Sequence, residues 1–141
     1  MKFGSELDAI QRRESLKAGA IAATVTLVFF GVFALGHQWL WHWFVWDGQL
    51  LLRAMMAGLS GGLFGITYRY AVRSTPNLQL KLGVVFAFGL VRACGQADVG
   101  IVFSNAFLTL TILGSESILL FAIAGITLDV AMQQGWVQPF E

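Results

Sequence analysis

The most constraining feature of this sequence is an apolar run from Ala18 to Gly36 that contains no charged residue. Its length matches the about 20 residues that an α-helix needs to cross the hydrocarbon core of a bilayer. The whole chain is 57% hydrophobic and 12% charged, and that charged fraction is about half that of an ordinary soluble domain. We therefore expect an integral membrane protein that folds as an all-α bundle of transmembrane helices.

Further apolar runs extend this bundle to about four transmembrane helices in a single domain, residues 1–141. The tryptophan-rich stretch after the first run is typical of the membrane interface, because indole rings settle at the level of the headgroups. A strong turn signal at Ser74–Asn77 separates the second helix from the third. We place the transmembrane helices at 18–36, 49–70, 78–95 and 116–133.

The apolar sequence from Ile101 to Met132 is too long for one ordinary crossing and too short for two. It is interrupted by Gly114-Ser115-Glu116-Ser117. We therefore expect a half-length segment over Ile101–Leu113 that lies in the interface or re-enters the bundle. The alternative is a single long helix that is tilted or kinked, since tilt accommodates extra length.

Residues 1–17 precede the first apolar run, and we predict that they form a short amphipathic helix along the membrane surface. A cleaved signal peptide fits less well, because acidic residues crowd what should be a basic leader. Lys and Arg gather in this segment and in the loop between the second and third helices. By the positive-inside rule, both termini should face the cytoplasm or the stroma.

Charged residues in or near the apolar runs fall into two layers. Each costs about 2.5–3.5 kcal/mol at the centre of a bilayer, so we expect them to have partners. The outer layer contains Arg53, Arg92, Asp98 and Glu116, and the inner layer contains Arg69, Arg73, Lys81 and Asp129. The pairs that we expect are Arg92–Glu116 or Arg53–Glu116 outside, and Asp129 with Arg69 or Lys81 inside. A polar path for an ion or proton is the alternative, but the sequence between the layers offers no carboxylate or histidine relay.

Small residues indicate where the helices approach one another, because helices in lipid associate through close backbone contact. The second helix carries four glycines spaced four apart on two neighbouring stripes: Gly58, Gly61, Gly62 and Gly65. This helix should lie at the centre of the bundle. The partner positions that we expect on the other helices are Gly19, Ala23, Gly31, Gly83, Gly89, Ala122 and Gly125.

The sequence contains no recognisable nucleophile–base constellation, phosphate loop or metal motif, so we expect no enzyme and no metal site. A net charge of +1 leaves no basic face for nucleic acid, and the single cysteine, Cys94, excludes an internal disulfide. No cofactor is required. A pigment such as chlorophyll or carotenoid would find its weak candidate binding residues in His37, His42, Gln96 and Asn105. The alternative for the histidines is ordinary interfacial hydrogen bonding.

Several stretches of the chain resemble a family of small membrane proteins of cyanobacteria and chloroplasts. They are GITYRYAVR (65–73), NLQLK (77–81), FAFGLVR (86–92), ESILLF (116–121) and DVAMQQGW (129–136). The resemblance covers the second to fourth helices, about half of the chain, and includes no catalytic motif. It implies a thylakoid or other oxygenic photosynthetic membrane. The positions that match the family's pattern are Tyr68, Arg69, Tyr70, Arg73, Lys81, Arg92, Glu116 and Asp129.

The function that we expect is that of a non-catalytic accessory or assembly subunit of a larger, photosynthetic membrane complex. Four short helices leave little interior for a substrate but a large lateral surface for other membrane subunits or for a second copy of the chain. The second hypothesis is a small oligomeric transporter or channel that uses the two charged layers. A pigment-binding role is the third.

Overall fold

The computed structural model describes residues 2–41, 48–73, 77–100 and 106–140 of the chain. Within these ranges the structure contains four α-helices: α1 (Lys2–Trp41), α2 (Gly48–Val72), α3 (Leu78–Gly100) and α4 (Ala106–Gln133). Each has a stretch that is long and apolar enough to cross a membrane. The all-α class is therefore confirmed, and the four stretches suggest an integral membrane protein.

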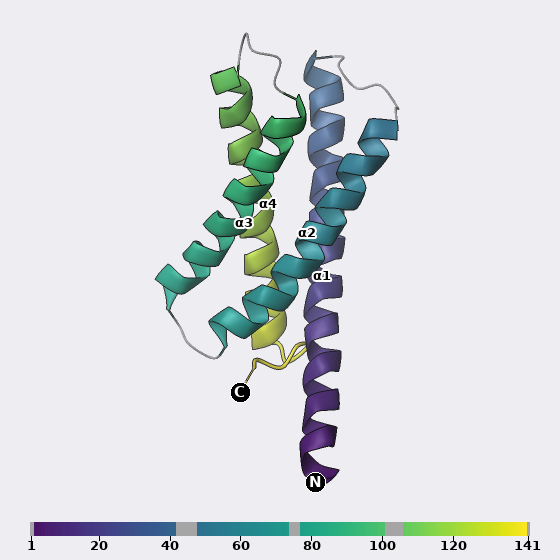
Figure 1. The fold of residues 1–141 in the computed structure, drawn as a ribbon, viewed down its shortest axis with the longest axis vertical. Helices are drawn as coiled ribbons and strands as arrows, with labels where there is room; N and C mark the ends of the chain where they lie inside the picture. The colour runs from purple at the N-terminus through teal and green to yellow at the C-terminus, as the bar shows by residue number, and fades with distance from the viewer. Residues whose placement is uncertain (1, 42–47, 74–76, 101–105, 141) are drawn as a thin grey trace.

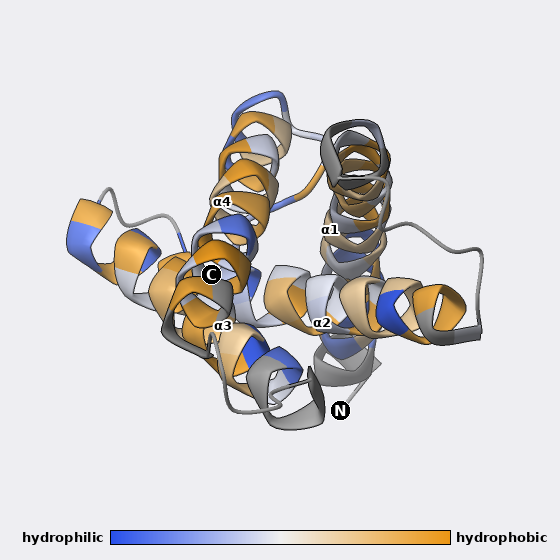
Figure 2. Cartoon of the chain, turned by 90° about the horizontal axis from the view of Figure 1, so that it is seen from above, coloured by the Kyte–Doolittle hydropathy of each residue, from blue (hydrophilic) through white to orange (hydrophobic). Residues whose placement is uncertain are grey.

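The helices run alternately up and down the bundle (Figure 1). Helix α1 packs along α2 and α3 packs along α4, while α4 also contacts α1 and α2. The two ends of the chain and the α2–α3 connection lie at the same end of the bundle, which we call the terminal end (Figure 1). Apolar residues surround all four helices, on outward as well as inward faces, as a bilayer would require (Figure 2).

The contact between α1 and α2 depends on glycine, as the sequence predicts. A Cβ at Gly61 would overlap the side chain of Thr26, and one at Gly65 would overlap Ala18 and Ala22. Gly62 lies opposite Gly19, where an added Cβ would come within 3.1 Å of the Gly62 carbonyl oxygen. The Thr26 hydroxyl donates across this contact to the carbonyl of Ala57, at 3.2 Å. Close backbone approach and an interhelical hydrogen bond thus hold the pair together.

An aromatic cluster fills the middle of the bundle. The fully buried ring of Phe64 on α2 packs against Phe88 of α3 and Phe121 of α4, with centroid distances of 5.4 and 5.0 Å. Gly125 of α4 leaves space for this cluster, because a Cβ there would lie 3.6 Å from the Phe64 ring and 3.5 Å from Val85. The cluster links three helices through one side chain of α2, so this helix is central, as predicted.

Two of the expected packing positions are open. A Cβ at Gly31 of α1 or Gly83 of α3 would meet no atom within 4 Å. Gly89, six residues after Gly83, instead packs against Ile118 of α4. A Cβ added at Gly89 would lie 3.0 Å from the Cα of Ile118. The prediction that Gly31 and Gly83 pack against other helices of the chain is therefore wrong, because each faces open space.

Helix α4 is continuous from Ala106 to Gln133, without the predicted break at Gly114–Ser117. The polar groups at this point are satisfied without unwinding the helix. The Ser115 hydroxyl donates to the carbonyl of Ile112 at 2.9 Å, and the Ser117 hydroxyl donates to Gln96 of α3 at 3.2 Å. The described part of the half-length segment over Ile101–Leu113 is thus the start of a long helix, the alternative given above. Residues 101–105 lie outside the described residues.

Helix α1 also differs from the sequence-based expectation. It is a single helix of 40 residues, so residues 2–17 continue in line with the apolar span and project beyond the other helices at the terminal end (Figure 1). At 1.5 Å per residue it is about 60 Å long, twice the thickness of a hydrocarbon core. The predicted surface helix at 1–17 is therefore upright in the structure.

Candidate functional site

A polar triad joins three helices near the terminal end. Lys81 of α3 forms an ion pair with Asp129 of α4, with 2.7 Å between Nζ and Oδ2. The hydroxyl of Tyr68 on α2 donates to the other carboxylate oxygen of Asp129, at 3.1 Å. The pairing of Asp129 with Lys81 is one of the two inner pairs that we expected. Because both oxygens of the carboxylate accept a hydrogen bond, the charge of Asp129 is compensated inside an otherwise apolar bundle.

Arg69 has a different environment from the one that we expected. Its side chain is almost fully buried, with 1% exposure, and it binds α1 and the segment after α4 instead of Asp129. Nε donates to the carbonyl of Gln138 at 2.7 Å, and Nη1 donates to the hydroxyl of Ser15 at 2.7 Å. Gln11 accepts from Arg69 through both its backbone carbonyl and its side-chain oxygen. A single guanidinium therefore ties together three segments that are distant in the sequence.

The segment Gln134–Phe140, which we call the strap, runs from the end of α4 back across α1 and α2. A positive φ of 75° at Gly135 lets the chain turn here, a conformation that glycine adopts without strain. Val137 is fully buried, and the backbone N–H of Gln138 donates to a carboxylate oxygen of Glu14 at 3.0 Å. The peptide groups of Gln138 thus bind a cation through the carbonyl and an anion through the N–H.

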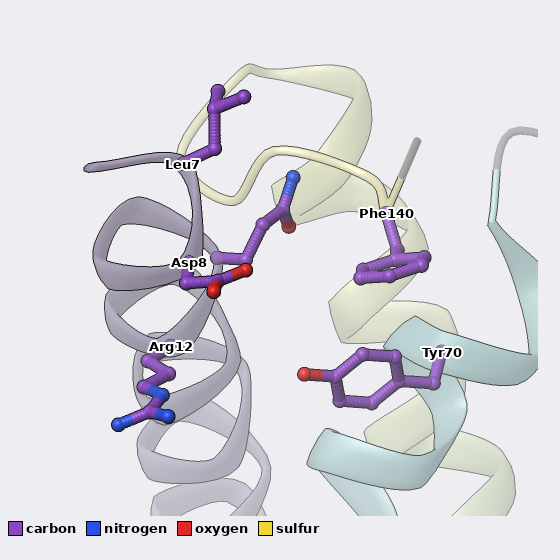
Figure 3. Close-up of a pocket in the computed structure, with 6 residues that line it drawn as sticks. Leu7, Asp8, Arg12, Tyr70 and Phe140 are labelled. Carbon is purple, nitrogen blue, oxygen red and sulfur yellow. The ribbon is translucent and has the colours of Figure 1, made fainter. Parts of the chain in front are cut away.

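The last described residue of the strap closes over the end of α2. The ring of Phe140 lies 4.7 Å from that of Tyr70, between centroids, and the guanidinium of Arg73 lies 5.4 Å from the Phe140 ring. Beside this aromatic pair is an open hollow between α1 and the strap, lined by Leu7, Asp8, Gln11, Arg12, Tyr70 and Phe140. Figure 3 shows the Tyr70 hydroxyl directed toward α1, whereas the Arg12 guanidinium extends away from the two rings. The hollow is therefore an aromatic and amide surface more than a charged pocket.

The residues of the outer layer are arranged more loosely. Arg92 of α3 reaches Ser60, midway along α2, where Nη1 lies 3.4 Å from the hydroxyl oxygen, and it approaches the ring of Phe30 at 6.0 Å. Arg53 is exposed on α2, and Arg92 is partly buried. The contacts described for Arg92 are thus with Ser60 and Phe30.

The proposed pigment ligands are less well defined. His42 and Asn105 lie outside the described residues, as does the side chain of His37. The side-chain oxygen of Gln96 accepts a hydrogen bond from Ser117 of α4. This oxygen therefore already takes part in a contact between two helices. In the part of the chain that the structure describes, no three His, Cys, Asp or Glu side chains are grouped as metal ligands would be.

Sequence reasoning identified the charged residues but missed the hydrogen-bond partners of Arg69. Gln11, Ser15 and Gln138 are polar residues of ordinary type, and Gln138 is 69 positions from Arg69. One signal was present: Arg69 lies within an apolar stretch and must find acceptors. Nothing in a single sequence says that these acceptors come from the two ends of the chain.

Comparisons with family models, with curated proteins and with solved structures give no match to this chain. Its function is therefore inferred from the arrangement of its own residues.

Proposed function

We propose that this chain is a non-catalytic accessory or assembly subunit of a larger membrane protein complex, and that α3 is the helix that it presents to a partner. The observation that carries this proposal is a stripe on the outward face of α3 where small residues lie on either side of Leu90, which is 52% exposed. Gly83, Ala87 and Cys94 are all exposed on α3, and their spacing places them on one face of the helix. Gly83 has open space where its Cβ would be.

The packed glycines of this bundle show how small residues serve a contact between helices. On α2 and α4, a Cβ at Gly61, Gly65 or Gly125 would meet a neighbouring helix. In lipid, such residues allow two backbones to approach, and this approach supplies van der Waals contact that larger side chains would prevent. The stripe on α3 has the same composition without a neighbour in the chain, so it suits a transmembrane helix of another subunit.

The interior of the bundle supports an assembly role over transport. Phe64, Phe88 and Phe121 fill the middle of the bundle. On the terminal side of this cluster, the polar triad is bonded internally. A conduction path would need polar groups that are hydrated or exchange partners. The two charged layers thus act as interhelical contacts in this proposal.

The membrane that we propose is the thylakoid, or else the cyanobacterial plasma membrane, with both termini on the stromal or cytoplasmic side. The support for the membrane is the resemblance of residues 65–136 to a family of photosynthetic organisms. The support for the orientation is the clustering of Lys and Arg near the terminal end.

Purification of the tagged protein in a mild detergent tests this function directly. We expect other membrane subunits to be recovered with the wild-type chain and to be lost with Gly83→Leu, which blocks the stripe. The matched control is Gly31→Leu on α1, another open position, which should retain the partners. Recovery of the lone chain or of its homo-oligomer would contradict the proposal, as would loss of the partners in both variants.

The single cysteine offers an independent readout, because Cys94 lies on the stripe and is exposed. A photoactivatable cross-linker attached to its thiol in native membranes should yield an adduct with a different polypeptide. An adduct with a second copy of the chain, or with lipid alone, would oppose an accessory role at this face.

A further inference from the structure

We propose that the strap, Gln134–Phe140, holds residues 2–17 of α1 upright, and that releasing the strap lets this segment bend onto the membrane surface. The proposal concerns the terminal end of the bundle, and it does not depend on the partner of α3.

The contacts of residues 6–17 show how few points hold this segment. Most of its side chains are exposed. The three that are not are Gln11, Glu14 and Ser15, and each is bonded either to Arg69 or to the strap. The attachment of the projecting segment to the rest of the bundle therefore passes through Arg69 and Gln138.

The strap also limits the freedom of Arg69. Its Nε donates to the Gln138 carbonyl, and this bond helps to orient the guanidinium whose other N–H groups bind Gln11 and Ser15. Without the strap, Arg69 loses an acceptor and Glu14 loses the Gln138 N–H. Both changes weaken the hold on α1 at once.

A released segment has the composition of a helix that binds a lipid surface. Leu7 and Ile10 are neighbours on one face of the helix and are exposed at 58% and 48%, so burial of this face in the interface would remove apolar area from water. Arg12, Arg13 and Lys17 are also exposed and would meet anionic headgroups. The strap bonds thus stabilise the upright position of the segment, and lipid contacts stabilise the surface-bound position.

The bend has a defined place. Ala18 is fully buried, and a Cβ at Gly19 would already crowd the Gly62 carbonyl, so α1 is fixed to α2 from residue 18 onward. Leu16 and Lys17 lie exposed between this contact and the strap contacts. The helix would therefore yield around residues 15–17.

The test uses the full chain in nanodiscs that contain anionic lipid. A fluorophore is attached through Glu6→Cys, in a chain whose native thiol is removed by Cys94→Ser; both positions are exposed. A spin label on the lipid headgroups quenches fluorophores that lie at the surface. The hold on residues 2–17 is weakened in two ways. Ending the chain at Gln134 removes the contacts of Gln138, and the double variant Gln11→Ala/Ser15→Ala removes the side-chain acceptors of Arg69 on α1. We call both of them the strap variants. The control is Thr24→Ala, whose hydroxyl donates within α1 to Ala20.

We expect quenching at position 6 to at least double in both strap variants and to be unchanged in Thr24→Ala. Equal quenching in the intact and strap variants would overturn the proposal, because the segment would then stand without the strap. Strong quenching in the intact chain would also overturn it. The double variant leaves the transmembrane stretches beyond residue 17 unaltered, so its failure to fold, seen by circular dichroism, would show that these bonds hold the bundle and not the segment.

Discussion

Lys81 and Asp129 place opposite charges 2.7 Å apart on two neighbouring helices, α3 and α4, inside the span of both. Their side chains retain 25% and 22% of their exposure, so the pair is only partly shielded by protein. A charged group in such a place is stable because its partner is present, which makes the two residues energetically dependent on each other.

The first prediction follows from this dependence. Asp129→Asn should lower the free energy of unfolding by about 1–3 kcal/mol, because it leaves the Lys81 ammonium without its counter-charge. Combining it with Lys81→Met should restore part of the loss. The measurement is a double-mutant cycle from denaturant unfolding in detergent micelles. If the losses of unfolding free energy in the two single variants simply added in the double variant, the ion pair would contribute nothing to stability.

Gly61→Ala should destabilise the contact between α1 and α2, since the new methyl group would overlap Thr26. The expected loss is about 1–3 kcal/mol, typical of overpacking in a tight interface. Gly31→Ala serves as the control, because the same methyl group would meet no atom within 4 Å. Thermal unfolding followed by circular dichroism distinguishes the two; similar midpoints would count against the described contact.

Arg69→Lys should be costly although the charge is retained. A lysine ammonium cannot reproduce the fork of N–H groups that binds Gln138, Ser15 and Gln11 together. We expect a loss of about 2 kcal/mol, the scale of one or two hydrogen bonds to a charged group. Arg73→Lys, at an exposed position, should change the unfolding midpoint little. The structure would be contradicted if both substitutions behaved alike.

Phe64→Ala should remove the central ring of the aromatic cluster and leave a cavity between α2, α3 and α4. Large-to-small changes of a buried phenylalanine cost about 3–5 kcal/mol. The comparison is Phe86→Ala on α3, where the side chain is 46% exposed. Denaturant unfolding should show a large shift for Phe64 alone, and equal shifts would place the core elsewhere.

The sequence was sufficient for the features that depend on local composition. Long apolar stretches predicted the four helices, and the glycine pattern of α2 predicted close helix contacts, which the structure shows with α1 at Gly61 and Gly65. Mixed charges at one depth predicted that Asp129 would pair with Arg69 or Lys81, and the structure shows the pair with Lys81. In each of these cases the physical requirement acts on the residue itself: length, small size, or an uncompensated charge.

Features that depend on contacts across the chain were beyond sequence reasoning. The upright segment of α1 depends on the bonds of Gln11, Glu14 and Ser15 with Arg69 and the strap. The sequence of one end of the chain does not indicate that it contacts the other end. The continuity of α4 depends on Ser117 finding Gln96 on another helix. Local signals for a break were present, and tertiary contacts outweighed them.

The continuity of α1 has a mechanical consequence. Since residues 2–41 form one helix, residues 2–17 and the apolar span that follows would move together as a lever while the strap is in place. Given a projecting arm of about 24 Å, a rotation of the buried part by about 10° would displace the tip by about 4 Å. Small changes in lipid thickness or in neighbouring subunits would in this way become measurable movements in the aqueous phase.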